Sequence, residues 1–110
     1  MRVPPLSGIF AVVRTHGEAW SAGRPLEEQA LWTEHATFMD RLADEGFALL
    51  VGPLEGTDDA LLIVRASDPD EVHRRLADDP WTSSKHLYTS RLAPWTLRIG
   101  AIPQPSLGTA

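Results

Sequence analysis

His35 and Asp79 are the first candidates for chemistry in this chain. Residues 26–45 fit a helix, and at about 100° per residue they place His35 in one stripe with Leu31, Phe38 and Leu42. A polar ring on an apolar stripe needs a partner, because an unpaired buried donor costs about 1–3 kcal/mol. That partner is either a backbone carbonyl of the core or a second titratable side chain.

Asp79 is the candidate for that second group. Asp78 and Asp79 end a second expected helix, where each negative charge opposes the helix dipole at a cost of roughly 0.3 kcal/mol or more. Pro80 pushes Asp79 out of the helical region, so the helix must stop there. Asp-Pro is also a common turn former. The sequence therefore leaves open whether Asp79 pairs with His35 or only ends the helix.

A His35–Asp79 pair would be suited to proton transfer. A carboxylate on one ring nitrogen fixes the tautomer and leaves the other nitrogen free as a base. No Ser or Cys nucleophile elbow accompanies these residues, so acyl transfer is not expected. A base without a nucleophile points to isomerisation or to elimination across adjacent carbons.

Large aromatic residues near these positions could bind a flat ring. Trp81 follows Pro80 directly and Trp32 lies three residues before His35, so both could form an apolar wall. Trp20 lies in the Gly- and Pro-containing segment 17–25 and could line or cover a pocket from that loop. Plain core packing is the alternative for each of these rings.

Composition excludes several other classes of function. The net charge is -5 and there is no basic run, which argues against nucleic acid or an anionic membrane as a partner. The chain has no cysteine, and its remaining histidines show no HxH or HExxH spacing, so we expect neither a metal nor a cofactor. No apolar run is long enough for a membrane helix and the start does not resemble a signal peptide, so we expect a cytoplasmic protein.

The pattern of apolar residues predicts four strands and two helices. We expect strands within 7–16, 47–54 and 60–66, and a last strand within 85–100 in which Trp95, Leu97 and Ile99 alternate with polar residues. The first helix covers 26–45 with Gly46 as its cap.

The second helix begins with a capping sequence. Asp68 is expected at the N-cap and Pro69 at the first position, and Glu71 completes a capping box. The resulting order β-α-β-β-α-β predicts an α+β, ferredoxin-like fold, with one antiparallel sheet and both helices on one face. The second and third strands are apolar on both faces, so the open face needs a cover. A second copy of the chain is the simplest cover, which predicts a homodimer.

Four motifs in order resemble the YCII-related domain family. They are His35 on the first helix, Gly52-Pro53 after the second strand, Asp79-Pro80-Trp81 after the second helix, and Pro94-Trp95 in the last strand. The resemblance covers roughly Ile9 to Ile99. We therefore divide the chain into an N-terminal extension (1–7), a YCII-like domain (8–100) and a loose C-terminal tail (101–110).

The resemblance implies a dimeric α/β barrel built from ferredoxin-like protomers, with a cleft in which His35 and Asp79 form a pair. It also implies proton-transfer or elimination chemistry on small cyclic or aromatic compounds. Family members often carry a basic residue shortly before the helix histidine, whereas residues 31–34 here are LWTE and the nearest base is Arg24. This departure argues against an anionic substrate.

Two rival functions remain open at this point. In the first, the chain is a non-catalytic dimer that binds a small apolar ligand or has a structural role, and His35 and Asp79 only satisfy each other. A sealed pair would favour that function, whereas a pair at an open cleft favours catalysis. The second rival, a cofactor-free monooxygenase, rests on analogy of fold alone.

Overall fold

A computed structural model describes residues 8–102 of the chain. Its four strands are β1 (Gly8–His16), β2 (Ala48–Pro53), β3 (Asp59–Ala66) and β4 (Leu87–Pro94). They form one antiparallel sheet in the order β2-β3-β1-β4. The helices are α1 (Trp32–Asp44), α2 (Pro69–Ala77) and the short α3 (Pro80–Ser83), and a 3-10 turn, η1 (Leu26–Glu28), precedes α1.

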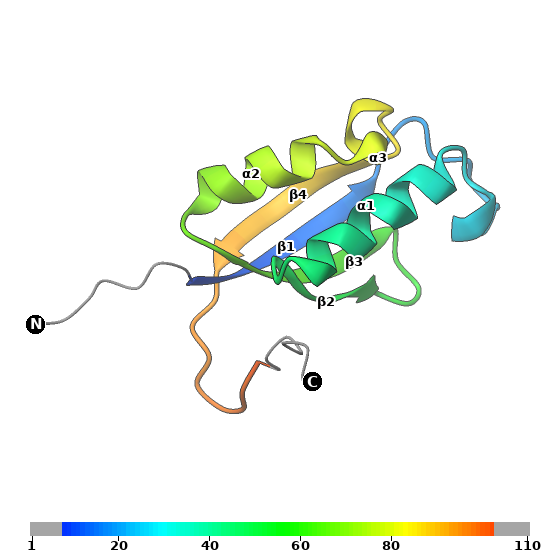
Figure 1. The fold of residues 1–110 in the computed structure, drawn as a ribbon. Coiled ribbons are helices and arrows are strands. Elements are labelled where there is room, and N and C mark those ends of the chain that lie inside the picture. The colour runs from blue at the N-terminus through cyan, green and yellow to red at the C-terminus, as the bar shows by residue number, and fades with distance from the viewer. Residues whose placement is uncertain (1–7, 103–110) are drawn as a thin grey trace, which may run out of the picture.

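The two long helices lie on one face of the sheet (Figure 1). This arrangement confirms the predicted ferredoxin-like α+β fold. Alternate residues of β1 point toward the helices, because side chains along a strand alternate between its two faces. Phe10 and Val12 are buried there, and the core is completed by residues of β3 and of both helices, among them Val64, Phe38, Leu42, Val72 and Leu76.

The first helix is shorter than its sequence pattern predicted. Residues 26–28 form η1, and Leu31 takes a left-handed conformation (φ 65°) at the N-cap of α1. The predicted continuous helix over 26–45 is therefore wrong at its start, and Leu31 is 40% exposed rather than part of the apolar stripe. Phe38 and Leu42 are buried as expected, and Gly46 follows the helix with φ 82°.

The break before α1 is held by a side chain that the sequence analysis did not single out. Gln29 is buried, and its amide oxygen accepts from the Ser21 backbone N–H at 2.8 Å. Its amide nitrogen donates to the backbone carbonyls of Ser21 at 2.9 Å and Arg24 at 3.0 Å. One side chain thus binds three backbone groups of the loop, and a continuous helix would not leave it free to do so.

The second helix begins as predicted, with one difference in its cap. The Asp68 side chain accepts from the Glu71 N–H at 2.8 Å, and Pro69 occupies the first helical position. The Glu71 carboxylate does not reach back to Asp68. It accepts instead from the Ser67 N–H at 2.7 Å and the Ser67 hydroxyl at 2.9 Å, so the capping box closes one residue earlier than predicted.

The last strand, β4 (Leu87–Pro94), ends before the alternating residues Trp95, Leu97 and Ile99 on which its prediction was based. β4 ends at Pro94, the last residue that pairs with β1, opposite Phe10, whereas β1 itself continues to Gly8 in its pairing with β3. Trp95 donates its N–H to the Ile9 carbonyl at 2.8 Å, and beyond it the chain leaves the sheet. Trp95 is 43% and Ile99 93% exposed, so the half-buried strand predicted around them is wrong.

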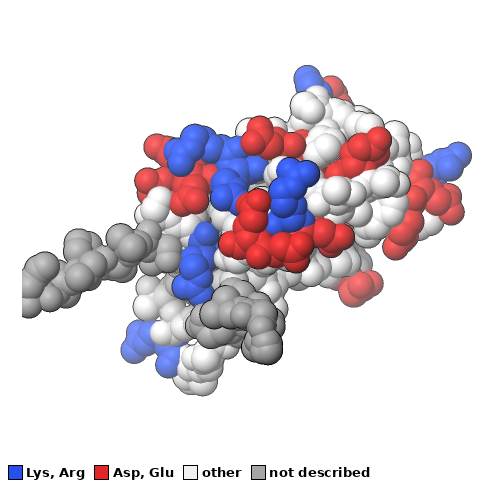
Figure 2. All heavy atoms as spheres, viewed as in Figure 1, with Lys and Arg blue, Asp and Glu red and all other residues white. Residues whose placement is uncertain are grey.

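The remaining predictions concern the surfaces and the ends of the chain. The sheet face opposite α1 and α2 carries no helix of residues 8–102 (Figure 1), and the homodimer remains a prediction. On the face viewed in Figure 2, described basic and acidic side chains are interspersed rather than gathered into one basic surface. No helix within 8–102 has the length and apolar character needed to cross a membrane. The predicted extension 1–7 and all but two residues of the predicted tail 101–110 lie outside the described residues.

Candidate functional site

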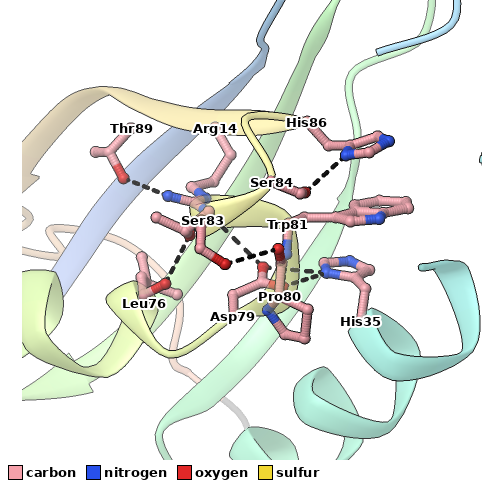
Figure 3. Close-up of polar contacts among 11 residues, drawn as sticks. Arg14, His35, Leu76, Asp79, Pro80, Trp81, Ser83, Ser84, His86 and Thr89 are labelled. Atoms are coloured by element: carbon pink, nitrogen blue, oxygen red, sulfur yellow. Dashed lines mark hydrogen bonds and ion pairs between the residues drawn. The ribbon is translucent and has the colours of Figure 1, made fainter. Parts of the chain in front are cut away.

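His35 and Asp79 are in direct contact. The Nδ1 atom of His35 lies 2.8 Å from one carboxylate oxygen of Asp79 and 3.0 Å from the other (Figure 3). If Asp79 is ionised, its carboxylate can only accept hydrogen bonds, and this contact then requires the proton to be on Nδ1. In the neutral ring, Nε2 is then the unprotonated nitrogen, which is the tautomer a general base requires.

Pro80, which follows Asp79 directly, restricts the backbone of Asp79 and so sets the direction of its side chain. Asp79 has extended backbone angles (φ -65°, ψ 125°), as the Asp-Pro pair predicts. It is the N-cap of α3, and its carboxylate also accepts from the Trp81 N–H at 2.9 Å. The sequence analysis placed Asp79 at the unfavourable end of α2 and missed α3. In the fold the carboxylate lies at a helix start, where a negative charge is favoured.

Arg14 is the third polar group of the site, and the sequence analysis missed it. It is buried on the helix-covered face of β1, and its Nη2 lies 3.6 Å from an Asp79 oxygen. Nη1 donates to the Thr89 hydroxyl at 2.8 Å and Nη2 to the Thr82 hydroxyl at 2.6 Å. Burial lowers the pKa of Arg14, and the Asp79 carboxylate acts in the opposite direction. The available signal was its position in the strand, two residues after the buried Val12.

Trp81 is stacked between two histidines. Its ring centroid is 3.9 Å from that of His35 with planes 11° apart, and 5.5 Å from that of His86 with planes 15° apart (Figure 3). The indole is fully buried, and its Nε1 donates to the Ala30 carbonyl at 2.7 Å. Both faces of the indole are covered by these histidines, and Trp81 also contributes to the lining of the cleft beside His35. Its predicted role as a wall for a ligand ring stays a prediction.

Trp20 and Trp32 lie around this stack and are half-buried. Trp20 meets Trp81 edge-on, with ring centroids 5.3 Å apart, and its own face is stacked on His16 at 3.8 Å. Trp32 is tilted against His35, with centroids 6.0 Å apart. The structure therefore brings all five predicted site residues into one cluster, although sequence reasoning left His16 and His86 out of it.

A cleft of about 590 Å³ opens beside His35. Its apolar walls come from η1, α1, β2 and the loop after β1, and include Trp20, Leu26, Trp32, Met39 and Val51. His35 contributes to the lining and its side chain is 12% exposed, whereas Asp79 behind it is 1% exposed. Such a cleft is of the size and apolar character typical of small-molecule sites.

The polar groups of the cleft are acidic or neutral. Asp40 and Asp59 contribute carboxylates, and no lysine or arginine is among the described residues that line it. Asp59 already accepts from the Thr15 hydroxyl at 2.8 Å. No group of three or more His, Asp or Glu side chains suited to a metal ion occurs within residues 8–102.

The two other histidines differ in their surroundings. His73 is exposed on α2, as expected, and lines a second, larger cavity of about 770 Å³ together with Arg14, Lys85 and Tyr88. His86 is buried, and its Nδ1 lies 2.7 Å from the Ser84 hydroxyl.

Comparison with known proteins identifies a family and a solved structure of similar fold. The family described as the YCII-related domain matches residues 10–96, while no curated protein matches the chain. The fold is similar to that of a solved 5-chloro-2-hydroxyhydroquinone dehydrochlorinase from Burkholderia phenoliruptrix AC1100, in complex with 2,5-dihydroxybenzoquinone. The two chains share 20% identity with a TM-score of 0.51, over 84% of this chain and 95% of that one. At this identity the likeness concerns the fold, which agrees with the predicted ferredoxin-like architecture.

Proposed function

The chain belongs to the YCII-related domain family, and we propose that it is an enzyme that moves a proton on a small cyclic or aromatic compound, with His35 as general base. The observation that carries the proposal is a histidine with one nitrogen bound to a buried carboxylate and a ring that borders an apolar cleft. A purely structural pair would have no need of that cleft. The solved dehydrochlorinase of similar fold supports elimination as the reaction to test first.

The proposed elimination needs no oxidant, reductant or other co-reactant. Nε2 of His35 takes a proton from the substrate, and the electron pair released forms the new double bond. The leaving group, such as chloride, departs with its own bonding pair from the adjacent carbon. The proton on the imidazole passes to solvent, and Asp79 stabilises the imidazolium while it exists. In an isomerisation the same proton would return to a different carbon.

We propose an uncharged ring as the preferred substrate. The cleft presents tryptophan and aliphatic surface to a flat molecule, and Asp40 and Asp59 would repel a substrate carboxylate. These carboxylates can accept hydrogen bonds from ring hydroxyls. We propose that Trp20 and Trp32 contact the ligand ring, while Trp81 holds the His35 ring in place by stacking against it.

The test is chloride release from 5-chloro-2-hydroxyhydroquinone under anaerobic conditions, followed with a chloride electrode. The wild-type protein is expected to release chloride, and His35→Gln to lose about 10²–10⁴-fold in rate, the usual contribution of a general base. Thr37→Ala, a substitution at an exposed position of the same helix, is the control and should keep the wild-type rate of chloride release. Equal turnover by His35→Gln would contradict the proposed base.

A ligand-binding experiment separates catalysis from the rival of a passive binding module. Quenching of tryptophan fluorescence by hydroquinone and by 2,5-dihydroxybenzoate compares two rings that differ in one carboxylate. We expect tighter binding of the uncharged ring. Binding without any turnover across a panel of halogenated hydroxyhydroquinones and cyclic lactones would favour the non-catalytic module. The homodimer predicted from sequence remains a proposal, which sedimentation equilibrium would test.

A further inference from the structure

An arginine lies in the core where the alternation of β1 calls for an apolar residue. Phe10 and Val12 are buried on the helix-covered face, and Arg14 is the next residue on it, with 3% of its surface exposed. Burying a guanidinium is costly unless it is paired and hydrogen-bonded. The fold meets this need with the two threonine hydroxyls and the Asp79 carboxylate.

The threonines fix where the guanidinium points. Thr82 donates its own hydroxyl proton to the Leu76 carbonyl at 2.7 Å, so its oxygen lone pairs are left for Arg14. Thr89 is opposite Arg14 in β4, immediately beyond the register shift between Val13 and Arg14. Both partners therefore belong to elements adjacent to the site, and they hold the cation against one side of Asp79 (Figure 3).

Charge balance gives Arg14 a specific consequence for His35. Asp79 has a fixed cation on one side and the His35 ring on the other. Without that cation, a buried carboxylate would be neutralised most readily by a second proton on the adjacent imidazole. A doubly protonated ring has no free nitrogen with which to accept a proton from a substrate.

We propose that Arg14 is a positioning residue, which supplies the permanent positive charge that lets Asp79 orient His35 while the outer nitrogen of His35 stays free. The catalytic consequence rests on the proposed function, but the protonation state of the ring is measurable with no substrate. The structure assigns this role to a side chain that lies behind the carboxylate and does not line the cleft beside His35.

Other titratable side chains lie near His35 and near Arg14. Asp40, Asp59 and His16 line the same cleft as His35, and His86 lies beyond Trp81. On the side of Arg14, the second cavity is lined by Glu18, His73 and Lys85, and Lys85 is 3.7 Å from Glu18. Among the described residues, only Arg14 and His35 come within ion-pair distance of Asp79.

The test is ¹⁵N NMR of the His35 ring at neutral pH in the wild type, Arg14→Lys, Arg14→Met and Arg14→Gln. The ring resonances are assigned by their absence in His35→Gln. We expect one protonated and one free nitrogen in the wild type and in Arg14→Lys, and two protonated nitrogens in both uncharged variants. Arg14→Gln keeps an amide donor toward the threonines and is the second variant if Arg14→Met does not fold.

Two outcomes would overturn the proposal. The first is a folded Arg14→Gln or Arg14→Met in which His35 keeps the wild-type pair of resonances. The second is a wild-type ring with both nitrogens protonated at neutral pH. Failure of the chloride-release assay would contradict the proposed function and leave these resonances unchanged, so the two failures are distinguishable. If turnover is found, the rate of Arg14→Gln should fall about tenfold or more at neutral pH and recover as the pH rises, with Arg14→Lys close to wild type.

Discussion

The imidazole of His35 lies flat against the indole of Trp81, with ring centroids 3.9 Å apart and planes inclined by 11°. Trp81 also donates its backbone N–H to Asp79 at 2.9 Å. One residue therefore contacts both members of the pair, the imidazole through its ring and the carboxylate through its main chain. The Nε1 bond to the Ala30 carbonyl ties the indole to the segment just before α1.

Replacing Trp81 by phenylalanine should loosen the pair without removing either member. The smaller ring cannot donate to Ala30, and that carbonyl loses its partner, which costs about 1–3 kcal/mol of unfolding free energy. Urea denaturation measures the loss, and the His35 ring resonances should broaden as the stack loosens. Trp95→Phe is the matched control, because Trp95 is 43% exposed and its change should stay within about 0.5 kcal/mol. Equal stabilities for the two variants would contradict the anchoring role of Trp81.

Asp79→Asn should be strongly destabilising. The amide cannot balance the charge of Arg14, and a buried ion pair that loses one partner typically costs about 3–5 kcal/mol. The neighbour Asp78 is exposed, so Asp78→Asn is the control and should change stability by no more than about 0.5 kcal/mol. Chemical denaturation of both variants at neutral pH is the measurement. A mild effect of Asp79→Asn would mean that Arg14 finds its compensation elsewhere.

The order of elements followed from the sequence because each carries its own local signal. Strands rich in Val, Ile and Leu, the Asp68–Pro69 helix start and the glycine after α1 are all encoded within a few residues. The last strand was misplaced because Trp95 and Ile99 alternate with polar residues as a strand would, yet the pairing of β4 with β1 stops at Pro94 and Phe10, although β1 continues to Gly8. Such a limit depends on the partner strand, which a local pattern does not contain.

The candidate site was predictable only in part, for a related reason. His35 stood out because a polar residue interrupted an apolar stripe, and Asp79 because proline followed it. Arg14 gave a weaker signal, since an arginine after Val13 is also what an exposed strand position looks like. Its role depends on Thr82 and Thr89, which are 68 and 75 residues away in the sequence. The burial of Trp81 depends likewise on His86 and on the loop that carries Ala30.

Gly17→Ala should perturb the loop that carries Trp20. A Cβ atom on Gly17 would lie 2.3 Å from the backbone oxygen of Lys85, and backbone atoms cannot yield as a flexible side chain can. The Gly17 N–H also donates to the His86 carbonyl at 2.8 Å, so relief of the clash would break this contact. We expect a loss of about 1–3 kcal/mol, as for overpacking, together with altered tryptophan fluorescence.

The control for this substitution lies in β2. Gly52→Ala adds the same methyl group where no atom lies within 4 Å of the new Cβ and the backbone angle is not left-handed. Its stability should stay within about 0.5 kcal/mol of wild type. Equal losses for the two variants would show that glycine flexibility, rather than the contact with Lys85, is what the substitution removes.

The cap of α2 should make a pH-dependent contribution to stability. Hydrogen bonds from the backbone and side chain of Ser67 lower the pKa of Glu71 below its ordinary value of 4.5, with smaller help from Arg75 and Arg74. Because the folded-state pKa is depressed, this contribution is fully present above the unfolded value and is lost as pH falls through the folded one. The difference in unfolding free energy between wild type and Glu71→Gln should therefore be constant near neutral pH and shrink below about pH 4.5. Urea titrations from pH 7 to pH 3 measure it, with Glu55→Gln in the exposed β2–β3 turn as control. A difference that grew toward acid would mean that the Ser67 bonds favour the protonated carboxyl.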